Sequence, residues 1–117
     1  MKIRIKGNSL RYRLTKTDVE QFNRDGYIEE TTTFGTQLFK YALQRSAAEV
    51  LTASFNNNTI TMYMPASMAN QWTSTDRVGY ESNINSLYLL IEKDFKCLDN
   101  VAEDQSDNYP NPLAFKG

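Results

Sequence analysis

Few side chains in this sequence can do chemistry, because its 117 residues include no histidine and one cysteine, Cys97. Nucleophile pairs of the Ser–His and Cys–His kind are therefore excluded, as are zinc sites built on cysteine and histidine. An enzyme of this composition would depend on carboxylates, lysine, tyrosine or a hard metal ion. The candidates are the segment Glu92-Lys93-Asp94 and the C-terminal acids Asp104 and Asp107.

Lys93 follows the most continuously apolar segment of the chain, Leu87 to Glu92, which we interpret as a central strand. Strict alternation of side chains carries Lys93 onto the face of Leu89 and Ile91. An inward lysine is costly without a partner. Either a bulge at Glu92-Lys93-Asp94 turns the lysine outward, or Lys93 lines a cleft. Carboxylate–lysine nuclease sites require a spacer residue between acid and lysine, and here the two are adjacent.

The acidic C-terminal segment allows two interpretations. Asp104 and Asp107, joined by Asp94, offer oxygen ligands to Ca²⁺ or Mg²⁺, as a metal-assisted hydrolase would need, but the twelve-residue loop of a calcium site is missing. Alternatively, residues 99–117 form a solvated acidic tail that folds back on the basic N-terminus. Low hydrophobicity and two prolines predict an extended or disordered tail after a single domain at residues 1–98.

A second group of charged residues lies at the N-terminus. Lys2, Arg4 and Lys6 alternate with isoleucines, and after Gly7-Asn8 the alternation resumes with Arg11 and Arg13. A period of two around a turn predicts a hairpin with one apolar and one basic face. Six of the thirteen cations and none of the fourteen acids fall within the first sixteen residues, although the whole chain has a net charge of -1.

The basic face of this hairpin has two interpretations. It is either a platform for an anion or nucleic acid, or a solvated face whose cations pair with acids on neighbouring strands. An isoelectric point of about 5.4 argues against nucleic acid. If the face binds a ligand, the expected site residues are Arg4, Arg11, Arg13, Glu92, Lys93 and Asp94.

Short strands and two helices must position these residues. A capping box at Thr15 predicts a helix from Lys16 to Arg24, and Pro65 begins a second helix that carries Trp72. Alternating segments separated by turn residues predict hairpins along the rest of the chain. The expected fold is α+β, a curled antiparallel sheet or open barrel of about seven to nine short strands with two short helices.

Three parts of the sequence carry a family resemblance. KIRIKGNSLRYRLTKTDVE at the start, TITMYMP in the middle, and LLIEKDFKCLD with EDQSDNYPNP near the end resemble a family of small bacterial proteins known only as a domain of unknown function. The resemblance implies a single-domain bacterial protein. It implies no activity, cofactor or catalytic residue for any position of this chain.

We therefore expect a small cytoplasmic binding module, not an enzyme, whose ligand is an anion or a protein partner. The alternatives are the metal-assisted hydrolase and a structural protein that self-associates, for example as a homodimer, along an unpaired sheet edge. No apolar run approaches the 18 residues of a membrane span, and no cofactor is expected.

Overall fold

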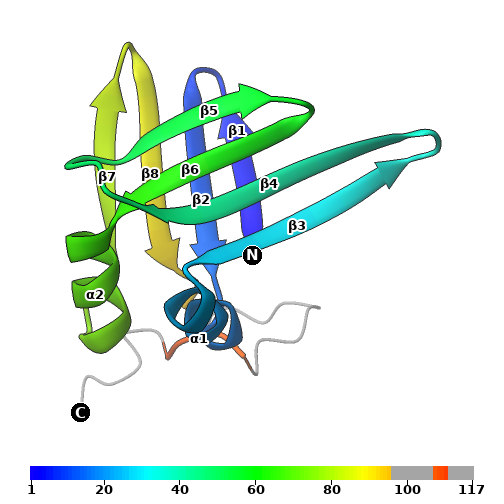
Figure 1. The fold of residues 1–117 in the computed structure, drawn as a ribbon. Coiled ribbons are helices and arrows are strands. Elements are labelled where there is room, and N and C mark those ends of the chain that lie inside the picture. The colour runs from blue at the N-terminus through cyan, green and yellow to red at the C-terminus, as the bar shows by residue number, and fades with distance from the viewer. Residues whose placement is uncertain (96–106, 111–117) are drawn as a thin grey trace.

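A computed structural model describes residues 1–95 and 107–110. These residues form eight strands and two short helices, which confirms the α+β class (Figure 1). In chain order the elements are β1 (Lys2–Lys6), β2 (Ser9–Leu14), α1 (Lys16–Asp25), β3 (Tyr27–Phe34), β4 (Gln37–Ser46), β5 (Thr52–Asn56), β6 (Thr59–Pro65), α2 (Ala66–Ser74), β7 (Gly79–Ile84) and β8 (Leu87–Lys93). No described helix is long and apolar enough to cross a bilayer.

The strands form two four-stranded sheets and, among the described residues, no closed barrel. Sheet A has the order β1-β2-β8-β7, and sheet B has the order β3-β4-β6-β5. Each sheet consists of two antiparallel hairpins joined at its centre by a parallel pair, β2 with β8 and β4 with β6. The apolar positions of both sheets face one shared core, and the helices lie together at one end (Figure 1).

Residues 1–95 contain two similar halves, residues 1–46 and 51–95, in which equivalent positions differ by 50. Each half has the element order ββαββ, and exchanging the halves converts the strand order of sheet A into that of sheet B. Lys2 pairs with Arg13 in the first hairpin, and Thr52 pairs with Tyr63 in the third. The two halves are thus related by an approximate two-fold symmetry of topology.

The helices obey the same equivalence. Phe22 of α1 and Trp72 of α2, which are 50 residues apart, are both fully buried, and their ring centroids lie 6.4 Å from each other. Thr15 and Asp18 form the expected capping box of α1, whereas position 65 before α2 is a proline without a side-chain cap. The two halves therefore meet at their helices as well as in both sheets.

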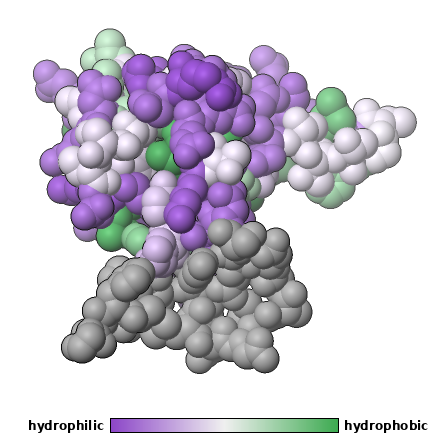
Figure 2. Space-filling model, turned by 90° about the horizontal axis from the view of Figure 1, so that it is seen from below, coloured by the Kyte–Doolittle hydropathy of each residue, from purple (hydrophilic) through white to green (hydrophobic). Residues whose placement is uncertain are grey.

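One register breaks the equivalence. In sheet A Ser9 lies opposite Tyr88, so strict equivalence would place Thr59 opposite Leu38, yet Thr59 lies opposite Lys40. A shift of two residues keeps every side chain on its face and moves β4 along β6 by roughly 7 Å. The β3–β4 hairpin consequently projects beyond its last pair with β6, Lys40 with Thr59, as an arm of residues 32–39 (Figures 1 and 2).

Residues 107–110 lie against the helix end of the molecule. The Lys16 amide donates to the Asp107 carbonyl at 3.1 Å, and the Tyr109 amide donates to the Asp94 carbonyl at 2.7 Å. The Tyr109 ring packs against Phe95, with 5.7 Å between centroids. Most of the predicted tail, with Cys97, lies outside the described residues, so the division at residue 98 stays a prediction.

Candidate functional site

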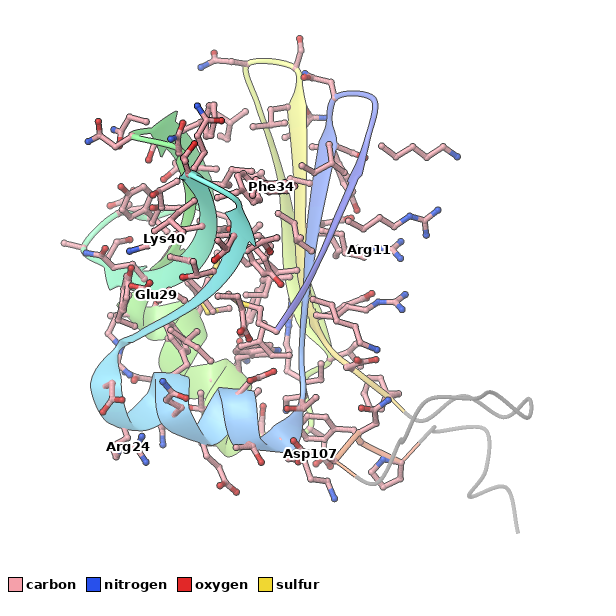
Figure 3. The ribbon with its side chains drawn as sticks, turned by 90° about the vertical axis from the view of Figure 1, so that its right-hand side faces the viewer. Arg11, Arg24, Glu29, Phe34, Lys40 and Asp107 are labelled. Carbon is pink, nitrogen blue, oxygen red and sulfur yellow. The ribbon has the colours of Figure 1, made fainter. Side chains whose placement is uncertain are left out.

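The cations of the first hairpin lie together on the outer face of sheet A. Register places Arg4 opposite Arg11 and Lys2 opposite Arg13, with all four side chains on the side away from the core. Arg11 points away from the body of the molecule in Figure 3. We call this surface the basic face; it comprises Lys2, Arg4, Lys6, Arg11 and Arg13.

Acids of neighbouring segments neutralise one side of the basic face. Glu92 of β8 accepts a hydrogen bond from Arg13 Nε at 2.9 Å, and its carboxylate lies 3.7 Å from Arg11 Nε. Lys2 Nζ lies 3.2 Å from Asp94 Oδ2. These contacts agree with the solvated, cross-strand-paired interpretation for part of the face.

On the other side of the basic face the nearby acid among the described residues, Glu81, accepts a hydrogen bond from the Tyr88 hydroxyl and forms no ion pair with a cation of the face. Arg4 and Lys6 are exposed and form no ion pair with the residues that the structure describes. Two hollows flank Arg4: one of about 190 Å³, which Lys6, Arg11 and Tyr88 also line, and one of about 140 Å³ between Arg4, Arg11 and Arg13. Arg4 and Arg11 therefore contribute to both hollows.

Sheet B shows that the fold does not require these cations. The positions equivalent to the basic face carry neutral side chains: Thr52, Ser54, Asn56, Thr61 and Tyr63. Their hairpin has the same length and the same internal register as the basic one. The positive charge is thus a property of one sheet and not of the architecture.

Lys93, a predicted site residue, faces the opposite direction. It continues the register of β8 opposite Leu14, so the predicted bulge is wrong, and its side chain points inward. Its Nζ donates to the Thr75 carbonyl at 2.7 Å and lies 5.3 Å from the Tyr109 ring centroid. Burial lowers the pKa of the Lys93 amine, and the nearby Asp76 carboxylate partly opposes that shift.

The alternative explanation, in which Lys93 lines a cleft, agrees with the structure. A cavity of about 480 Å³ near the end of α2 is lined by Lys93, Asp76, Phe95 and Tyr109. Burial raises the pKa of the Tyr109 phenol to about 12. Lys93 and the basic face are therefore separate surfaces, whereas Asp94 borders the basic face through its contact with Lys2.

The predicted metal ligands do not form a group among the described residues. Asp104 lies outside them. Asp107 accepts hydrogen bonds from the Thr17 hydroxyl at 3.0 Å and the Thr17 amide at 3.4 Å, beside the first turn of α1 (Figure 3). Hydrogen bonds from Thr15 and Thr17 lower the pKa of Asp107. No cluster of three potential metal-ligating side chains occurs in residues 1–95 and 107–110.

Comparison with known protein families identifies the family of this chain. A family model described as a family of unknown function, DUF7009, matches residues 1–113. The chain belongs to DUF7009. No curated protein and no solved structure matches it. The function of this DUF7009 chain is therefore inferred from its geometry.

One feature of the DUF7009 chain was not predicted from its sequence. An apolar cleft of about 410 Å³ opens between the sheets, away from the helices. Its main side chains are Ile5, Leu10, Phe39, Phe55, Ile60 and Leu87. Ile5 and Phe55, at equivalent positions, remain 58% and 67% exposed. Alternation puts each on the apolar face of its hairpin, and the signal that distinguishes them from core residues is their shared position one residue before the end of a strand.

Proposed function

We propose that this protein is a non-enzymatic binding module whose basic face holds an anionic group of a ligand or partner. The observation that carries the proposal is the difference between equivalent surfaces. Five cations lie on sheet A, two of them without an acidic partner among the described residues, where sheet B has five neutral side chains.

The chemistry of the face suits an oxyanion. Arg4 and Arg11 lie directly opposite each other on adjacent strands, and like charges in that arrangement repel. An anion between them would relieve the repulsion and accept the paired N–H donors of a guanidinium. Glu92 already accepts a hydrogen bond from Arg13. The side of the basic face that carries Arg4 and Lys6 is therefore the side open to an anion.

Citrate titration followed by NMR tests the proposal. The double variant R4S/R11T introduces the residues that sheet B carries at the equivalent positions, so the fold should tolerate both changes. We expect citrate to shift amide resonances of β1 and β2 and to bind the variant at least tenfold more weakly. The matched control R24S/K40S removes two charges elsewhere. Equal affinity for R4S/R11T and wild type, or equal loss in the control, would contradict the proposal.

The arm supports a second candidate function, self-association. Phe34 and Leu38 near its tip are 64% and 47% exposed, and β3 is an edge strand along its whole length. Exposed apolar residues on an unpaired edge favour pairing with another chain. Sedimentation equilibrium tests this candidate: we expect a concentration-dependent dimer that F34S/L38S abolishes. A wild-type monomer at millimolar concentration would rule it out.

A further inference from the structure

We propose that the anion is amphiphilic: a single-chain fatty carboxylate whose alkyl chain lies in the apolar cleft and whose carboxylate reaches Arg4 and Lys6. This inference rests on the proposed function of the basic face and names the ligand class for it. The proposed ligand would contact both the apolar cleft and the basic face, which lie on opposite faces of β1.

The cleft has the character of a small-molecule site. Its volume of about 410 Å³ falls within the range of sites for molecules of modest size, and its walls are predominantly apolar. Ile5 and Phe55, one from each half, present large apolar side chains to solvent at its opening. An alkyl chain between the two hairpins would remove both from water, which is the main source of affinity for such a ligand.

The cationic groups lie beside this opening. β1 is the edge strand of sheet A, so nothing in that sheet covers its outer side. Ile5 lines the cleft, and its neighbours Arg4 and Lys6 line the basic hollow on the other face of the same strand. Ser9 and Leu10 line both spaces. A ligand that leaves the cleft over the edge of β1 therefore meets two cations without acidic partners in the described structure.

Charge and shape together select the ligand class. A neutral alkyl compound would leave the two cations unused, and a short anion would leave the cleft open. A membrane surface is broad and flat, whereas this cleft lies between two hairpins and takes one chain. The long aliphatic stem of Lys6 allows its ammonium group to bend toward a carboxylate at the strand edge.

The test compares carboxylates of increasing length on the full chain. Acetate, hexanoate, octanoate and decanoate, each below its micelle concentration, are titrated and followed by NMR, with 1-octanol as the neutral control. We expect affinity to rise about threefold to fourfold per methylene between hexanoate and decanoate. Amide resonances of Leu10 and Phe55 should shift together with those of β1. Octanol should bind at least tenfold more weakly than octanoate.

Two variants separate the parts of the site. I5T/F55T should abolish the dependence of affinity on chain length, because it removes two large apolar side chains from the cleft. The variant should fold, since both side chains are more than half exposed and can be changed without opening the core. R4S/K6S should reduce octanoate binding to the level of octanol. The control F34S changes an exposed aromatic outside the cleft and should bind octanoate like wild type.

The possible failures are distinguishable. If citrate binds through Arg4 and Arg11 but decanoate binds no better than acetate, the proposed function stands and the amphiphile inference is overturned. If decanoate binds equally to wild type and R4S/K6S, the inference is also overturned. The same holds if decanoate binds only after lipid vesicles are added to the titration. If neither citrate nor any carboxylate binds, both fail.

Discussion

At the scale of single residues, a residue of one half can be compared with the residue at the equivalent position of the other half. Lys93 is equivalent to Leu43, which is fully buried opposite Ile28 and Met62. The lysine occupies a core-like position and is only 6% exposed. One hydrogen bond to Thr75 and the Tyr109 ring replace the apolar contacts that a leucine would make. A buried ammonium group with so few partners reduces the stability of the fold.

The K93L variant measures this cost. We expect it to be as stable as wild type or to gain about 1 to 3 kcal/mol at pH 7, because an apolar side chain replaces a buried charge. The pKa of Lys93 in the folded state lies below its ordinary value of 10.5. The cost is therefore fully present below the folded pKa and disappears as pH rises toward 10.5. Urea unfolding should show the advantage of K93L shrinking as pH rises toward 10.5.

A surface lysine provides the comparison for this prediction. Lys16 is exposed on α1, so K16L should change stability little and with no such pH dependence. A K93L protein that is several kcal/mol less stable than wild type, or an advantage that grows with pH, would show that Lys93 makes stronger contacts than those described.

At the scale of elements, the halves differ in how they begin their helices. Thr15 Oγ1 accepts a hydrogen bond from the Asp18 amide, and the Thr15 amide donates to the Asp18 carboxylate at 3.0 Å. Pro65 provides no equivalent group for α2. Helix α1 therefore depends on its cap, whereas α2 depends on the packing of Ala69 and Trp72.

Removal of the cap should be measurable. We expect T15A to lower the free energy of unfolding by about 1 kcal/mol, because an N-terminal amide of α1 loses its acceptor. The control S67A lies in the first turn of the uncapped helix and should change stability by only a few tenths of a kcal/mol. Chemical denaturation of the three proteins makes the comparison; equal loss in both variants would contradict it.

Local patterns predicted these elements but not their assembly. Alternation around Gly7-Asn8 and the capping box at Thr15 depend on residues close in sequence, and the structure has both features. The parallel pairing of β2 with β8 joins residues 79 positions apart, for which alternation carries no information. Pairing Thr59 with Lys40 or with Leu38 leaves the same faces buried, so the pattern cannot reveal the arm.

The candidate site was predictable to a similar extent. Arg4, Arg11 and Arg13 lie on one face because alternation within a hairpin is local. Glu92 joins them only because β8 lies beside β2. Whether Lys93 faces inward depended on the absence of a bulge, which the sequence left open. The apolar cleft requires both halves in place, and no single segment signals it.

At the scale of the whole molecule, neither half has a sheet of its own. The first half gives β1 and β2 to sheet A and β3 and β4 to sheet B, and the second half contributes the complementary hairpins. Removing either half would leave two separate hairpins, and isolated hairpins are at best marginally stable in water. The described body should therefore unfold as one unit.

Equivalent core substitutions test this cooperativity. Leu14 and Met64 are fully buried at equivalent positions. We expect L14A and M64A each to cost about 3 kcal/mol. In both variants the transition seen by Trp72 fluorescence, a reporter in the second half, should coincide with that seen by far-UV circular dichroism. A Trp72 transition that moves in M64A but not in L14A would show that the halves unfold separately.

The constant offset of 50 residues is the arrangement that tandem fusion of two copies of a self-pairing ββαββ unit would produce. A homodimer of such units must carry the same residues on both sheets, so any charge gained by one face appears on the other. A fused chain has no such constraint. Here one outer face is cationic while the equivalent face is neutral, and the registers of the two central parallel pairs differ by two residues. A fused chain can thus carry a charged face on one sheet alone, although the topology of its two sheets is symmetric.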